Sequence, residues 1–251
     1  METHTTETGT GTEAVHAERT PSFLLAKPEK RALQAIAKRL PRWILPDDLT
    51  LLGIAAALAI AAAYVLSNGD RAWLWVASGL LVVHWLGDSL DGTLARVRGI
   101  QRPRYGYYLD HLVDAGATAA IGIGLGLSPY MLLSVGMLLV VAYLAMSINV
   151  YLESQALGRF SIGYGKLGPT ELRVLMIGLN TALALGLDMR FELFDTGLTG
   201  LDVVGVALAL AMVAALAARA WRSLRELAKA EPAARRVWTT RPAAGSPAGG
   251  S

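Results

Sequence analysis

The segment Asp88-Ser-Leu-Asp91-Gly92-Thr-Leu-Ala95-Arg96 is followed, after nine residues, by Gly106-Tyr-Tyr-Leu-Asp110-His-Leu-Val-Asp114. Four carboxylates therefore interrupt a region that is otherwise apolar. A charged side chain at the centre of a bilayer costs about 2.5 kcal/mol or more. Because of that cost, acids at such positions indicate a functional site.

The composition is that of a membrane protein. Of the 251 residues, 53% are hydrophobic and 17% are charged, whereas a soluble domain has about 25% charged residues. The mean hydropathy of +0.42 agrees with several membrane-spanning segments. Disulfide bonds and thiolate chemistry are excluded because the sequence has no cysteine. Basic residues flank the apolar segments, so no nucleic-acid partner is expected.

Both ends of the sequence differ from its apolar middle. Residues 1–26 are rich in Thr, Glu and Gly, and residues 230–251 are rich in Pro, Ala, Gly and Ser. Neither end has enough apolar side chains to offset the entropy of ordering the chain, so both are expected to be disordered. Residues 27–229 are predicted to form one membrane domain.

An amphipathic helix is predicted at residues 28–43. Its apolar side chains share one face, and lysines and arginines surround them. Trp43 and the apolar segment that follows favour a location at the membrane interface, although an ordinary solvated helix has a similar pattern. The apolar positions are Leu33, Ile36, Ala37 and Leu40.

Six apolar segments follow, each near the roughly 20 residues that cross the hydrocarbon core of a bilayer. Lysines and arginines gather before the first segment and after the second, fourth and sixth. By the positive-inside rule, both termini are cytoplasmic. The predicted fold is an all-α membrane protein with six transmembrane helices after the amphipathic helix. The predicted spans are residues 49–67, 72–95, 106–127, 130–152, 170–187 and 201–221.

This topology brings the four aspartates to a similar depth near the cytoplasmic face. Asp88 and Asp91 are spaced i, i+3 and Asp110 and Asp114 are spaced i, i+4, so each pair shares one helix face. Carboxylates that meet repel one another unless a cation lies between them. Oxygen ligands favour Mg²⁺, Mn²⁺ or Ca²⁺. Four carboxylates can hold two ions, an arrangement that favours displacement at phosphorus.

Small residues and an arginine accompany the acids. Gly92 and Gly106 leave space for a bulky ligand to approach the backbone. Ala95 continues this small face, and Arg96 provides a positive charge that can meet a phosphate. Parts of this pattern occur in other kinds of membrane protein, since intramembrane acids also form ion or proton pathways and small residues also pack helices together.

The combined pattern resembles the signature of the CDP-alcohol phosphotransferases, with all eight motif residues present. The nine residues between Arg96 and Gly106 exceed the spacing common in the family by one, and the extra residue falls in a turn. The resemblance implies transfer of a phospho-alcohol group from a CDP-linked donor to an acceptor hydroxyl, with release of CMP. It also implies two Mg²⁺ or Mn²⁺ ions and a homodimer.

The resemblance further implies roles for individual residues. Asp114 would be the general base that takes the acceptor's proton. The segment Pro46-Asp47-Asp48-Leu49-Thr50 is similar to the family's Pro-Asn-x-Leu-Thr, with Asp47 or Asp48 in place of the asparagine. The implied metal ligands are Asp88, Asp91, Asp110 and Asp114, and the implied CDP contacts are Thr50, Asp48, Gly92, Ala95, Arg96 and Gly106.

A short six-span chain is similar to the prokaryotic members, which use CDP-diacylglycerol as the donor and a small polar alcohol as the acceptor. Transfer from CDP-choline or CDP-ethanolamine to a lipid is the alternative. Lys166, Glu171 and Arg173, near the start of the fifth span, are candidate acceptor contacts. A capped helix start with basic side chains that reach the interface accounts for the same residues. The expected location is the cytoplasmic membrane of a prokaryote, with the site facing the cytoplasm.

Two other classes of membrane protein also place acids within spans. An ion or proton transporter would leave Gly92, Ala95, Arg96 and Gly106 without a role. A prenyltransferase carries its acids in differently spaced motifs on separated spans. The single block from Asp88 to Asp114 favours the phosphotransferase.

Overall fold

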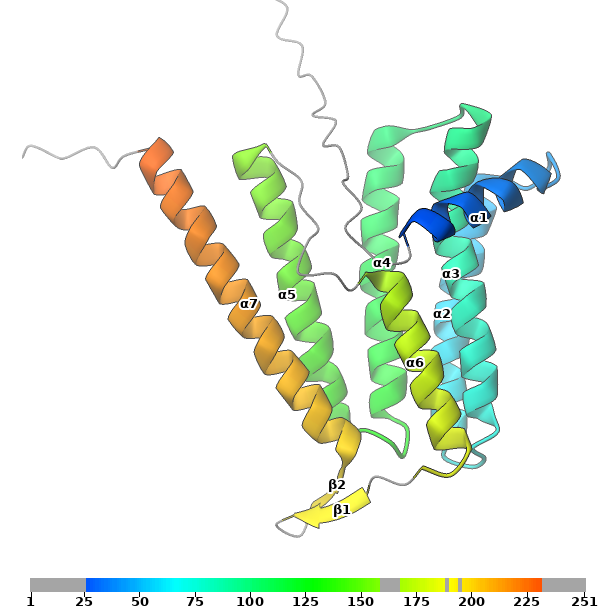
Figure 1. The fold of residues 1–251 in the computed structure, drawn as a ribbon, viewed down its shortest axis with the longest axis vertical. Coiled ribbons are helices and arrows are strands. Elements are labelled where there is room, and N and C mark those ends of the chain that lie inside the picture. The colour runs from blue at the N-terminus through cyan, green and yellow to red at the C-terminus, as the bar shows by residue number, and fades with distance from the viewer. Residues whose placement is uncertain (1–25, 159–167, 188–189, 194–195, 232–251) are drawn as a thin grey trace, which may run out of the picture.

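The computed structural model describes residues 26–158, 168–187, 190–193 and 196–231. This part of the chain forms seven helices and a two-stranded hairpin (Figure 1). The elements are α1 (Ala26–Arg39), α2 (Pro46–Leu66), α3 (Trp73–Arg98), α4 (Pro103–Gly126), α5 (Leu133–Leu157), α6 (Pro169–Ala184), β1 (Arg190–Leu193), β2 (Thr196–Thr199) and α7 (Gly200–Ala230).

Helices α2 to α7 overlap the six predicted spans. Among the described residues, four helices are long and apolar enough to cross a membrane, namely α2, α3, α5 and α7. Helix α4, which carries Asp110 and Asp114, is not among these four, and α6 has only 16 residues. The six-span count and the cytoplasmic termini therefore stay predictions.

The all-α prediction is wrong for the connection between α6 and α7. Strands β1 and β2 pair there in antiparallel fashion, with Arg190 opposite Thr199 and Leu193 opposite Thr196. Each strand has only four residues, which is too short for a clear alternating pattern in the sequence. The hairpin leads directly into α7. Thr199, the last residue of β2, caps this helix, because its hydroxyl accepts a hydrogen bond from the backbone N–H of Asp202.

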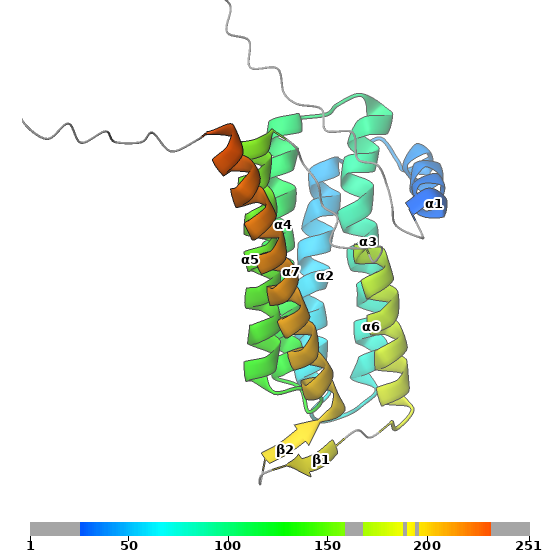
Figure 2. The same cartoon turned by 60° about the vertical axis from the view of Figure 1, so that its left-hand side comes forward.

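The long helices form one bundle (Figures 1 and 2). Helix α2 contacts both α3 and α4, α5 contacts α4 and α7, and α6 packs on α3. Toward the hairpin end, Ile60, Leu74 and Leu81 are fully buried in an apolar core. The Tyr64 hydroxyl donates a hydrogen bond to Asn180 Oδ1 at 3.1 Å, which joins α2 to α6 inside this core.

Glycines allow α2, α3 and α4 to approach one another closely. A Cβ atom at Gly87 of α3 would lie 2.7 Å from the backbone nitrogen of Gly53 of α2. A Cβ atom at Gly124 of α4 would lie 2.5 Å from the Cα atom of Ala61 of α2. The first contact lies one residue before Asp88, and the second lies near the opposite end of α4.

Helix α1 crosses the outer side of α3 (Figures 1 and 2). Leu33 and Ala37 are buried in a cluster with apolar residues of α2 and α3, so the apolar face of α1 packs against protein. Glu29 Oε1 accepts hydrogen bonds from Trp85 Nε1 on α3 and from Thr170 Oγ1 on α6, both at 2.9 Å. One carboxylate thus joins α1 to two helices of the bundle.

Candidate active site

Three of the four aspartates come together between α3 and α4. One carboxylate oxygen from each of Asp88, Asp110 and Asp114 lies within 4.8 Å of the other two. All three residues are partly buried. The short turn between the helices and the i, i+4 spacing on α4 produce this grouping. Three hard oxygen ligands at this separation fit a divalent cation such as Mg²⁺ or Mn²⁺.

Asp91 lies outside this group of three and makes different contacts. Its Oδ2 atom accepts a hydrogen bond from Thr50 Oγ1 on α2 at 2.7 Å, and its Oδ1 atom accepts one from the backbone N–H of Gly92. The close contact at Gly87 makes the bond from Thr50 possible, because it brings the start of α2 against α3. Thr50, an implied nucleotide contact, here orients a carboxylate.

The two acids at the start of α2 stabilise the local structure. Asp48 Oδ2 accepts a hydrogen bond from the backbone N–H of Leu45 at 2.8 Å, which closes the first turn of the helix. Asp47 forms an ion pair with Arg102, in the turn between α3 and α4. Nucleotide binding by Asp48 stays a prediction.

The small-residue face is present on α3. Arg96 Nη2 donates a hydrogen bond to Thr93 Oγ1 at 3.0 Å. A Cβ atom at Gly92 would lie 3.3 Å from Arg96 Nη1, so the guanidinium lies over this glycine. Ala95 is partly buried, and a Cβ atom at Gly106 of α4 would meet no described atom within 4 Å. Contact of these residues with CDP stays a prediction.

The structure places one candidate acceptor contact at the acids. Arg173 Nη2 donates a hydrogen bond to Asp88 Oδ2 at 2.7 Å, and the two side chains form an ion pair. Glu171 Oε2 accepts a hydrogen bond from the backbone N–H of Gly168 at 3.0 Å and caps α6. Lys166 lies outside the described residues.

Two residues that were not predicted from the sequence support the site. His84 Nδ1 lies 3.2 Å from Arg173 Nη2, and His84 is one helix turn before Asp88. Gly87 permits the contact between α2 and α3. A histidine four residues before a signature aspartate was the available signal for His84, whereas a glycine within a span has no specific signal.

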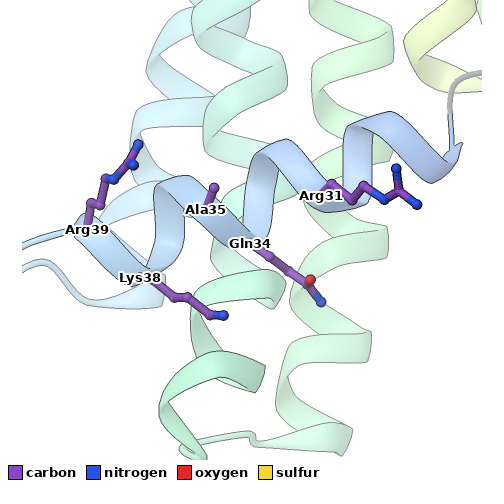
Figure 3. A pocket seen from close by; sticks show the side chains of 5 residues that line it. All are labelled: Arg31, Gln34, Ala35, Lys38 and Arg39. Carbon is purple, nitrogen blue, oxygen red and sulfur yellow. The ribbon is translucent and has the colours of Figure 1, made fainter.

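A separate basic surface lies on the outer face of α1, away from Leu33 and Ala37. It surrounds a shallow depression of about 330 Å³ (Figure 3). Within the described part of the chain, no carboxylate pairs with the cations of this surface. Its residues are Arg31, Gln34, Ala35, Lys38 and Arg39, which recur at helical spacing.

With this geometry established, comparison with known proteins gives the family. The family model for CDP-alcohol phosphatidyltransferase matches residues 43–221, which include all four signature aspartates. The chain belongs to the CDP-alcohol phosphatidyltransferase family. This membership agrees with the resemblance that the signature indicated. It favours a phosphotransferase over the transporter and prenyltransferase alternatives.

Two known proteins are similar to this chain. Phosphatidylinositol phosphate synthase from Cutibacterium acnes (strain DSM 16379 / KPA171202) is 33% identical over 84 residues, or 34% of this chain and 38% of the relative. The matched part thus spans well under half of that protein. The crystal structure of Mycobacterium tuberculosis phosphatidylinositol phosphate synthase (PgsA1) in complex with manganese and citrate has a similar fold. Its TM-score is 0.53 at 23% identity, covering 78% of this chain and 88% of that chain.

Proposed function

We propose that this phosphatidyltransferase moves a phosphatidyl group from CDP-diacylglycerol to the hydroxyl of a small polar alcohol, in phospholipid synthesis. The observation that carries the proposal is the set of carboxylates of Asp88, Asp110 and Asp114, within 4.8 Å across α3 and α4. With Asp91 they would hold two Mg²⁺ or Mn²⁺ ions. Such ions neutralise charge on the diphosphate of the donor and stabilise the leaving oxygen.

In the proposed reaction, Asp114 takes the proton of the acceptor hydroxyl. The acceptor oxygen forms a bond to the β-phosphorus of the donor, the bond from this phosphorus to the bridging oxygen breaks, and CMP leaves with that oxygen. Thr50 keeps Asp91 oriented through its hydrogen bond. The residues proposed to contact the nucleotide are Asp48, Thr50, Gly92, Ala95, Arg96 and Gly106.

The acceptor is proposed to carry a phosphate, with inositol phosphate as the first candidate. A guanidinium group binds phosphate through paired, charge-assisted hydrogen bonds, and Arg173 lies beside the acids. Lys166 would add a second charge, and Glu171 would hold the start of α6 in place. The names of both relatives support this acceptor.

The enzyme is proposed to work as a homodimer in the cytoplasmic membrane of a prokaryote. Six spans would place the acids on the cytoplasmic side. The four apolar helices and the arginines between α3 and α4 support this location.

Release of CMP by the purified protein tests the proposal. With CDP-diacylglycerol, CMP is expected only when divalent metal is present, and faster with inositol phosphate than with inositol, glycerol 3-phosphate or serine. Asp114→Asn should lower turnover by about 100-fold or more while CDP binding is retained. Asp70→Asn, in the turn before α3, is the matched control. Undiminished turnover in Asp114→Asn would remove this residue from the mechanism, and CMP release only from CDP-choline or CDP-ethanolamine would support the alternative donor.

A further inference from the structure

Arg173 lies where a cation is needed to balance the acids. Its guanidinium is 2.7 Å from Asp88 Oδ2, and the carboxylate of Asp88 also belongs to the group with Asp110 and Asp114. The side chains of Arg173 and Asp88 are only 14% and 22% exposed, so water screens the pair weakly. In the structure, the side chain of Arg173 thus places a positive charge next to these carboxylates.

The neighbours of Arg173 hold its guanidinium in this place. His84 Nδ1 and Asp88 Oδ2, one turn apart on α3, both lie within hydrogen-bond distance of Arg173 Nη2. The start of α6 is fixed by the cap from Glu171 and by the bond from Thr170 to Glu29 on α1. The ion pair is therefore a supported feature of the fold.

We infer that Arg173 competes with the divalent cation for Asp88. The inference rests on the proposed metal site, because it concerns the affinity of that site. A cation coordinated by Asp88 would approach the guanidinium closely, and like charges at such distances repel. This repulsion, together with the loss of the ion pair where the metal displaces the guanidinium from Asp88 Oδ2, lowers the affinity for metal. Before the metal is bound, Arg173 balances the charge of the acids.

Titration of Mn²⁺, followed by electron paramagnetic resonance without nucleotide, measures this competition directly. Arg173→Gln and Arg173→Met remove the charge and are expected to bind Mn²⁺ about tenfold more tightly than the wild type. Arg173→Lys keeps the charge and should bind with affinity close to the wild type. Arg222→Gln, on the exposed end of α7, controls for loss of a distant positive charge and should change nothing. Wild-type or weaker affinity in both the Gln and Met variants would overturn the inference.

Thermal unfolding supplies a second readout. Without Arg173, Asp88 loses its ion-pair partner, so the Gln and Met variants should gain more in Tm on addition of Mn²⁺ than the wild type does. Equal gains would contradict the inference. Asp110→Asn separates it from the proposed function. If this variant binds Mn²⁺ like the wild type, the proposed metal site fails. If it loses Mn²⁺ while the Arg173 variants keep wild-type affinity, only the role of Arg173 fails.

Discussion

A single hydroxyl group connects α2 to the acids of α3. Thr50→Val keeps the shape of the side chain but removes its 2.7 Å hydrogen bond to Asp91. Hydrogen bonds to charged groups contribute about 1.5–3 kcal/mol, so the rate of CMP release is expected to fall about 10- to 100-fold. Thr50→Ser keeps the hydroxyl and should stay close to the wild type. A wild-type rate in Thr50→Val would show that other groups hold Asp91.

The sequence predicted the spacing of the acids but not their partners across helices. Neighbours on one helix follow from its period, which brought Asp110 and Asp114 to one face. Thr50 and Asp91 are 41 residues apart, and Asp88 and Arg173 are 85 residues apart. Such contacts depend on how whole helices pack. The sequence therefore predicts Thr50 as a CDP contact and Arg173 as an acceptor contact. It does not predict their hydrogen bonds to Asp91 and Asp88.

At the scale of helices, the contact of α2 with α3 depends on a glycine. Gly87→Ala would place a methyl group 2.7 Å from the backbone of Gly53, so the helices must separate. Overpacking of this kind typically costs about 1–3 kcal/mol, and a lower Tm together with slower CMP release is expected. Gly79→Ala is the matched control on the same helix, since a Cβ atom there meets nothing within 4 Å. An unchanged Tm in Gly87→Ala would show that the contact is not required.

The basic outer face of α1 is expected to prefer anionic lipids. Because the apolar face of this helix packs on the bundle, its cations face outward beside α3, which is long and apolar enough to cross a membrane. Each basic residue near an anionic membrane surface contributes about 1 kcal/mol. Native mass spectrometry should therefore detect more phosphatidylglycerol than phosphatidylcholine retained by the wild type, and a reduced preference in Lys38→Glu/Arg39→Glu.

A control variant separates the α1 surface from net charge. Arg222→Glu/Lys229→Glu, on the exposed end of α7, makes the same change in charge elsewhere. It should keep the lipid preference of the wild type. Equal loss in both double variants would assign the preference to overall charge.

Helix positions were predictable because the apolar segments are long. Helix ends were less so. Helix α3 continues to Arg98 and stops where Gly99 adopts a φ of 67°, a left-handed conformation that favours glycine. Helix α7 extends to Ala230, beyond the predicted end at residue 221. The polar segment after the apolar one is rich in Leu, Arg, Glu, Lys and Ala, which favour a helix. The β1–β2 hairpin was missed because pairing of two short strands has no strong local signal.

For the molecule as a whole, the absence of native cysteine makes topology measurable. Single cysteines at Gly69, between α2 and α3, and at Gln101, between α3 and α4, occupy exposed turns at opposite ends of α3. With six spans and cytoplasmic termini, a membrane-impermeant thiol reagent added to intact cells should label Gly69→Cys and not Gln101→Cys. Disrupted cells should show labelling of both. The reverse pattern in intact cells would overturn the predicted orientation.

The two glycine contacts of α2 also have a mechanical consequence for substrate binding. Helix α4 packs closely on α2 near Gly124, at the end of α4 remote from Asp110. Helices α2 and α3, in contrast, pack closely next to Asp88. We expect the Asp110 end of α4 to pivot about Gly124 when substrate binds, while Asp88 and Asp91 stay still. Spin-label distances from α2 should then change for a label near residue 105 and not for one near residue 126. A change at both positions would mean that the whole of α4 moves relative to α2, which would contradict a pivot at Gly124.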